Sequence, residues 1–199
     1  MMRKLSLVAA ALALMAPIAA TQAEGIGYTY VDLGYVTTDV DGIDKDADGF
    51  VLRGSLEVAD DFFVYGRYTD QSLKYGGNKL DIERYSVGGG YAWSFADNMD
   101  LFGKIGYTKY EAELSTTVGS GSLDDDGYEL GVGIRARPLS ALELEGTINY
   151  VDLSDSGDDT SLGVAALWYI ADHLALGVEG EFADEESTYG IGFRWEFGR

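Results

Sequence analysis

The chain has 199 residues, a formal net charge of −20 at neutral pH, 27 glycines, 14 tyrosines, two prolines and no cysteine. A surface this acidic repels nucleic-acid phosphates, so DNA and RNA are excluded as partners, and no disulfide can stabilise the fold. The glycine and aromatic content favours β-structure over a helical bundle, and the length suits one domain.

Residues 1–23 have the features of a secretory signal peptide. Arg3 and Lys4 form a basic start, an apolar run follows from Leu5 to Ala20, and residues 21–23 make a plausible cleavage site. We therefore expect residues 24–199 to form one exported domain, with 12 basic against 34 acidic residues and a charge of −22. No later segment approaches the roughly 20 apolar residues that a spanning helix needs. Any membrane span must then be a closed barrel of strands.

After residue 24 the sequence repeats a unit of two strands with alternating apolar and polar residues. The stretch 189–197 shows the pattern clearly, because its odd positions are large and apolar while its even positions are glycine or charged. Counting such stretches predicts about ten strands. Eight strands, obtained by merging or discarding a hairpin, is the alternative.

The connections between these strands alternate strictly between short and long. Short turns with a related sequence lie at residues 59–62, 96–99, 139–142 and 171–174, and acidic long connections lie at 39–48, 70–79, 111–126, 152–159 and 183–187. This asymmetry is typical of outer-membrane barrels, which have short periplasmic turns and longer extracellular loops. The sequence therefore predicts an all-β, up-and-down antiparallel transmembrane β-barrel.

Aromatic residues occupy both ends of the apolar faces, which predicts two girdles at the membrane surfaces. A soluble β-sandwich or lipocalin-like barrel is the alternative, but a packed core has no reason to sort tryptophan to one end and tyrosine to the other. The girdle beside the short turns and the C-terminus consists of Phe62, Trp93, Trp168, Trp195 and Phe197. The girdle beside the long connections consists of Tyr35, Tyr68, Tyr107, Tyr128, Tyr150 and Tyr189.

The opposite face of the strands carries charged residues among glycines. They could pack the lumen, with each guanidinium satisfying carboxylates on neighbouring strands, or line a small selective pore. We favour packing, because a barrel of this strand number has a narrow lumen. The predicted charge network consists of Arg53, Glu57, Arg67, Arg84, Lys104, Glu129, Arg135, Glu179 and Arg194.

The first long connection resembles the start of a calcium-binding loop. Asp44, Asp46, Asp48 and Gly49 match the opening of an EF-hand, but the twelfth position is Ser55 where the bidentate glutamate belongs. One hypothesis is weak Ca²⁺ binding that tethers the rim to anionic headgroups. The other is a solvated acidic loop.

No constellation of catalytic residues is present. The single histidine, His173, lies in a short turn, and a general base needs a partner and a pocket. The glycine run at residues 88–90 lies inside a strand and cannot form a phosphate loop. We expect neither an enzyme nor a cofactor.

Three segments, residues 27–31, 83–91 and 189–197, carry a resemblance to the small OmpA-like outer-membrane β-barrels. Among these the chain is similar to a single-domain family shed in outer-membrane vesicles and once proposed as a secreted signal. The resemblance implies a monomeric barrel in the bacterial outer membrane that contacts lipid and lipopolysaccharide. The closing strand, ending on Trp195 and Phe197 before Gly198 and Arg199, is similar to the insertion signal read by the barrel-assembly machinery. The expected function is that of a structural, surface-displaying envelope protein, and a narrow porin is the alternative.

Overall fold

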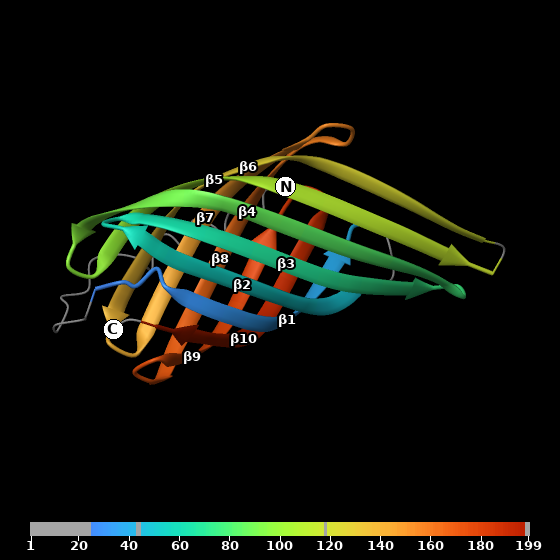
Figure 1. The fold of residues 1–199 in the computed structure, drawn as a ribbon. Helices are drawn as coiled ribbons and strands as arrows, with labels where there is room; N and C mark the ends of the chain where they lie inside the picture. The colour runs from blue at the N-terminus through green and yellow to red at the C-terminus, as the bar shows by residue number, and fades with distance from the viewer. Residues whose placement is uncertain (1–24, 43–44, 118, 198–199) are drawn as a thin grey trace.

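The computed structural model describes residues 25–42, 45–117 and 119–197. The expected signal peptide, Asp44 and the last two residues lie outside this range. Ten strands account for most of the described chain (Figure 1). They are β1 (Tyr30–Val40), β2 (Ala47–Ala59), β3 (Phe62–Tyr75), β4 (Asn78–Ala96), β5 (Met99–Thr116), β6 (Gly119–Leu139), β7 (Leu142–Leu153), β8 (Gly157–Ala171), β9 (Leu174–Phe182) and β10 (Glu186–Glu196).

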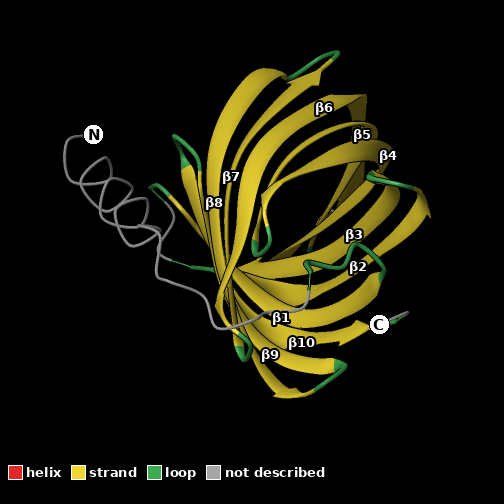
Figure 2. Ribbon diagram, turned by 90° about the vertical axis from the view of Figure 1, so that its left-hand side faces the viewer, coloured by secondary structure: helices red, strands yellow, loops and turns green. Residues whose placement is uncertain are grey.

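The strands form one closed antiparallel barrel in which each strand pairs with its neighbours in the chain and β1 pairs with β10 (Figure 2). The closing pair runs in register from Tyr30 opposite Glu196 to Val40 opposite Glu186. Closure leaves no sheet edge in the barrel wall. The predictions of an up-and-down barrel and of ten strands, not eight, are confirmed. No helix in the described segments is long and apolar enough to cross a membrane.

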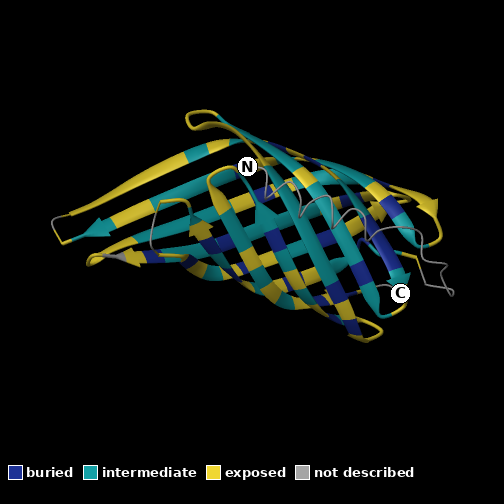
Figure 3. Ribbon diagram, turned by 180° about the vertical axis from the view of Figure 1, so that it is seen from behind, coloured by how far each residue is buried: buried dark blue, intermediate teal, exposed yellow. Residues whose placement is uncertain are grey.

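Alternation along each strand sends apolar side chains outward and charged side chains into the lumen. In β10, Ile191, Phe193 and Trp195 are exposed on the outer surface, while Arg194 and Glu196 are buried inside. Figure 3 shows the resulting pattern of buried and exposed bands along the strands. This barrel is apolar outside and polar inside, the reverse of a water-soluble protein.

The four short turns lie together at one end of the barrel, with the C-terminus (Figure 1). The strand pairing is irregular at each of these turns, between Glu57 and Ala59, between 94 and 96, between 136 and 139, and between 169 and 171. A carbonyl in each turn accepts a backbone hydrogen bond from a later strand, as that of His173 does from Glu196 N–H at 2.9 Å. These hydrogen bonds tie each short turn to the strand that follows its hairpin. His173 takes part in this pattern through its backbone carbonyl.

Three of the predicted long connections are mainly strand: 70–79, 111–126 and 152–159, the last of which is strand except for residues 154–156. At residues 70–79 and 111–126, where acidic loops are expected, β3 extends to Tyr75 and β4 begins at Asn78, while β5 extends to Thr116 and β6 begins at Gly119. Gly76 and Gly77 have φ values of 60° and 86°, which suit a tight hairpin turn. Apolar and polar residues also keep alternating in both segments, as at Leu73 in the first and Ala112 and Leu114 in the second. The outer parts of β3, β4, β5 and β6 beyond the barrel rim form a sheet that we call the overhang (Figure 1).

Candidate functional site in the barrel interior

A buried ion cluster occupies the lumen near the short turns, with Glu143 of β7 at its centre. The Glu143 carboxylate accepts hydrogen bonds from Arg135 Nε at 2.9 Å, Arg135 Nη2 at 2.6 Å and Arg137 Nη2 at 2.6 Å. It also accepts from Tyr169 Oη at 3.1 Å and from Arg194 Nη1 at 3.5 Å. The Glu143 side chain is 0% exposed. Three guanidinium groups therefore converge on one carboxylate from which water is excluded.

Further carboxylates and aromatic rings balance these arginines. Arg194 donates two parallel hydrogen bonds to Asp32, at 2.8 and 2.9 Å, and its guanidinium lies 3.8 Å from the centre of the Tyr30 ring. Glu196 lies 3.6 Å from Arg137 and accepts from the Tyr169 hydroxyl. Paired and stacked in this way, the charges avoid the cost of several kcal/mol that an isolated buried ion carries.

An apolar floor lies beside the ion cluster and includes the segment that precedes β1. Tyr28 is 6% exposed and stacks on Phe63 with ring centres 4.8 Å apart, and Phe102 packs edge-on at 6.5 Å. Arg135 Nη1 donates to the Gly27 carbonyl at 3.0 Å. The preceding segment is thereby fixed against the same arginine that holds Glu143.

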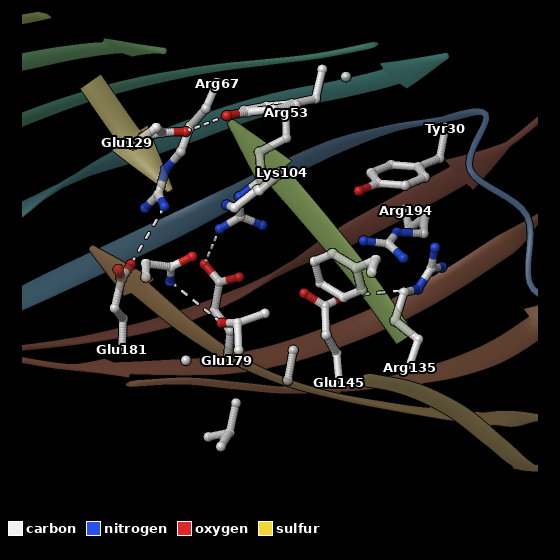
Figure 4. Close-up of a pocket in the computed structure, with 18 of the residues that line it drawn as sticks. Tyr30, Arg53, Arg67, Lys104, Glu129, Arg135, Glu145, Glu179, Glu181 and Arg194 are labelled. Atoms are coloured by element: carbon white, nitrogen blue, oxygen red, sulfur yellow. Dashed lines mark hydrogen bonds and ion pairs between the residues drawn. The ribbon is translucent and has the colours of Figure 1, made fainter. Parts of the chain in front are cut away.

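The middle of the lumen is less tightly filled than the ion cluster. This part of the lumen contains a cavity of about 160 Å³, and the residues of three ion pairs line it (Figure 4). Arg84 is 3.0 Å from Glu129, Arg67 is 3.4 Å from Glu181, and Arg53 pairs with Glu179. Side-chain exposures of 17–26% for Arg53, Arg67, Arg84, Glu179 and Glu181 contrast with 0–2% for Arg135, Arg137 and Glu143. The lumen thus has a sealed half near the short turns and a polar chamber above it.

Lumen glycines make room for the large side chains. A Cβ added to Gly106 would lie 2.4 Å from the Tyr65 hydroxyl oxygen, and one added to Gly131 would lie 2.4 Å from Lys104 Cε. The Tyr65 hydroxyl donates to Glu129 at 2.8 Å. Lys104 lies 5.4 Å from the Tyr65 ring centre and has no carboxylate within ion-pair distance among the described residues. Large side chains therefore fill the space that glycines leave on neighbouring strands.

The structure brings most of the predicted charge network into the lumen. Glu57 is the exception, because it lies exposed at the irregular end of β2 and no described ion pair includes it. Arg137 and Glu143 face inward by the same alternation and complete the ion cluster, although the nine residues of the predicted network do not include them. The available signal was the close spacing of Arg135, Arg137 and Glu143 around one short turn, with all three on the inward face.

All eleven predicted girdle residues point outward. Most are 45–57% exposed, while Tyr68 and Tyr150 are partly covered by neighbouring rings, Tyr68 by Tyr85 at 5.0 Å and Tyr150 by Tyr128 at 6.2 Å. That these rings lie at the two membrane surfaces stays a prediction.

The predicted calcium site has two described members. Asp46 and Asp48 are both exposed, and Asp44 lies outside the described range. The described residues contain no group of three or more acidic or histidine side chains arranged to hold a metal ion.

At the outer rim, Asp125 fixes the turn between β7 and β8. Its carboxylate accepts from the backbone N–H of Ser156 at 2.8 Å and of Asp155 at 3.1 Å. The Ser156 side chain and these N–H groups lower the Asp125 pKa below its ordinary value of 3.8. A lowered pKa means that this stabilisation is complete above the ordinary pKa and is lost as pH falls through the lowered one.

We therefore expect the Ser156 amide resonance to titrate in NMR spectra with a midpoint below pH 3.8. Asp125→Asn should abolish that titration, whereas Asp48→Asn, at an exposed site on β2, should leave it unchanged. A midpoint at or above the ordinary aspartate value would contradict the proposed role of Asp125.

Comparisons with known proteins agree with this architecture. The model of the outer membrane protein β-barrel domain family matches residues 6–197. No curated protein sequence matches the chain. Among solved structures, Ail, the attachment invasion locus protein of Yersinia pestis in complex with the heparin analogue sucrose octasulfate, is 21% identical with a TM-score of 0.50 over 86% of this chain and 99% of its own. The translocator domain of the autotransporter NalP from Neisseria meningitidis is 10% identical with a TM-score of 0.53 over 98% of this chain and 96% of its own. At these identities the likeness shows a shared fold.

Proposed function

This chain belongs to the family of outer-membrane β-barrel proteins, and from that premise we propose that it is a non-enzymatic, surface-displaying envelope component with a closed lumen. The barrel is located in the bacterial outer membrane. In this proposal the short turns face the periplasm, and the overhang with its acidic residues faces outward. The barrel then serves as a membrane anchor for the overhang.

The buried ion cluster is the observation that carries this proposal. Ion conduction needs a continuous path of water, but Arg135, Arg137, Glu143 and Glu196 are at most 2% exposed. The apolar floor formed by Tyr28 and Phe63 lies beside them. Opening this half of the lumen would separate three guanidinium groups from their carboxylates, at a cost of several kcal/mol.

Single-channel recording of the refolded protein in a planar bilayer, at neutral pH and high salt, tests the proposal. A heat-dependent gel shift should first show that the barrel is folded. We expect no steady current. Reproducible conductance steps would refute the closed-lumen function.

A narrow porin is the second candidate function, and the polar chamber is the observation that favours it. Six basic residues line the cavity against four glutamates (Glu129, Glu145, Glu179 and Glu181), so the lining has a net formal charge of +2, with Lys104 outside the described ion pairs, and would favour anions if a path through the ion cluster opened. Anion-selective conductance steps, with a selectivity that is weaker in Arg84→Gln, would support this function over the first.

We further propose that the barrel is a monomer that contacts lipid and lipopolysaccharide with its outer face, and that its closing strand β10 directs insertion by the assembly machinery. Replacing both Trp195 and Phe197 with alanine should leave unfolded chain in the periplasm, because the membrane anchors of the closing strand are lost. The yield of heat-modifiable barrel in isolated outer membranes measures this effect.

The pair Trp93 and Phe95 on β4 provides a matched control, because its ring centres are 6.3 Å apart and those of Trp195 and Phe197 are 6.4 Å apart. Trp93→Ala with Phe95→Ala removes the same aromatic groups from the wall but keeps the closing strand. Equal losses of assembled barrel in the two double variants would argue against a special role for β10.

A further inference from the structure

The outer end of β6 is an open strand edge. Along one side β6 pairs with β5 from Gly119 onward, but β7 joins the other side only at Gly127, opposite Leu153. Within the described chain, no strand pairs with this second side of residues 119–124. The N–H of Ser154 donates to the Asp126 carbonyl at 3.0 Å, which shows that the backbone groups of Asp126 point to this side.

Backbone groups of successive residues in an antiparallel strand point to opposite sides. The N–H and C=O groups of Ser120, Ser122 and Asp124 therefore face the same way as those of Asp126. We call the unpaired side of residues 119–124 the open edge. A row of free donors and acceptors of this kind is a template for an added strand.

A row of four carboxylates leads across the overhang to the open edge. Asp70 of β3 is opposite Glu83 of β4, Glu83 is opposite Glu111 of β5, and Glu111 is opposite Asp124 of β6. Residues directly opposite in a sheet share one face, and like charges in that position destabilise the pairing. Lys109 neutralises part of the row through a 2.6 Å contact with Glu111, but Asp124 is exposed at the end of the row.

The other face of the same strands is apolar. Leu123 is 79% exposed and lies opposite Ala112, and the neighbouring Leu114 is 46% exposed and lies opposite Leu80. Figure 3 shows this outer end of the barrel as largely exposed. The open edge therefore has carboxylates on one face and uncovered leucines on the other.

We propose that the open edge binds an extended peptide segment of alternating basic and apolar residues, which adds to β6 as an antiparallel strand. Its basic side chains lie beside Asp124 on the carboxylate face, and its apolar side chains cover Leu123 on the opposite face. A second copy of this chain is disfavoured as the occupant, because pairing two open edges would bring two carboxylate rows together. The inference rests on the proposed display function, since the overhang must face outward to meet such a segment. Peptide binding is independent of conduction by the lumen, so the two proposals can fail separately.

The geometry of the added strand gives a strict test. In an antiparallel pair, residues that exchange hydrogen bonds share a face. The basic residues of the peptide must therefore donate their N–H groups to β6, while the N–H groups of the apolar residues point away. A capped octapeptide of alternating lysine and valine can be N-methylated on either set without changing its charge.

Binding is measured by calorimetry with the full chain in nanodiscs of zwitterionic phosphatidylcholine. We expect saturable binding of the parent octapeptide, unchanged binding after methylation of the valines, and binding at least about tenfold weaker after methylation of the lysines, since several edge hydrogen bonds are lost. An octapeptide of the same composition with its lysines and valines in two blocks should bind as weakly. Equal binding of the two methylated peptides would show that the attraction is general electrostatics, and the proposal would be wrong. The same conclusion would follow if the peptide with its lysines and valines in two blocks bound as well as the parent. Absence of binding by the parent peptide would also overturn it.

Variants of the protein locate the interaction. Ser122→Pro removes an N–H that points to the open edge while leaving the β5–β6 ladder its hydrogen bonds, so it should weaken parent binding about tenfold. Asp124→Asn should weaken binding several-fold and reduce its dependence on salt, whereas Asp48→Asn, on β2 and away from the edge, should change neither. Unchanged binding by Asp124→Asn would show that the carboxylate row does not attract the peptide. If Ser122→Pro fails to fold, the methylated peptides still test the edge in the unmodified protein.

Discussion

Replacement of Glu143 by alanine is expected to lower the free energy of unfolding by about 3–5 kcal/mol, the usual cost of removing one partner from a buried ion pair. The reason is local, because Arg135, Arg137 and Arg194 all direct nitrogens at this one carboxylate. Without it the three guanidinium groups repel one another in a site without water. The effect should therefore exceed that of deleting any ion pair in the polar chamber.

Urea unfolding of the barrel in phospholipid vesicles, followed by tryptophan fluorescence, measures this change. Glu145→Ala is the matched control, because Glu145 is the next inward residue of β7, its side chain is 26% exposed, and it lies 3.8 Å from Arg135 Nε. We expect the control to cost less than about 1 kcal/mol, the usual value of an accessible ion pair. Equal destabilisation by the two variants would show that the cluster does not hold the lumen together.

Gly88→Ala is expected to destabilise the barrel by about 1–3 kcal/mol through overpacking. A Cβ at this position of β4 would lie 2.2 Å from the Ile105 carbonyl oxygen and 2.7 Å from the Tyr65 ring. The first of these atoms belongs to the backbone of β5, so β4 and β5 would have to separate. Because Tyr65 bonds Glu129, its displacement would also disturb the pair between Glu129 and Arg84.

The adjacent glycine provides the control for this prediction. Gly89 faces outward, and a Cβ there would meet only the Phe63 carbonyl oxygen at 3.5 Å, an ordinary contact. Gly89→Ala should therefore unfold at nearly the same urea concentration as the parent. Similar midpoints for Gly88→Ala and the parent would mean that the wall relaxes around the added methyl group.

Strand number and strand facing could be predicted from the sequence because both depend on a period of two. A residue such as Arg194 has only two possible directions, and its apolar neighbours Phe193 and Trp195 decide between them. The same rule failed at residues 70–79 and 111–126. The acidic residues there indicate loops, but residues such as Leu73 and Leu114 keep the period of two. The apolar face changes sides between the wall and the overhang, because Tyr107 and Glu111 share one face of β5 and Leu114 lies on the other.

The partners inside the lumen could not be predicted in the same way. Parity gives the face of a residue, but its height depends on the stagger between strands that closure imposes. Arg194 and Asp32 are 162 residues apart and meet only because β10 closes on β1. Glu143 is the centre of the cluster for the same reason, since two strands, β6 and β10, place three arginines at its level.

The continuous pairing of the overhang with the barrel wall has a mechanical consequence. β5 is paired with β4 and β6 without interruption from its outer tip into the wall, and the hydrogen bonds run perpendicular to the strands. A pull on the tip along the strand direction is therefore shared by many bonds in shear and does not break them one after another. The overhang can therefore bear a load along its strands without separating from the barrel wall.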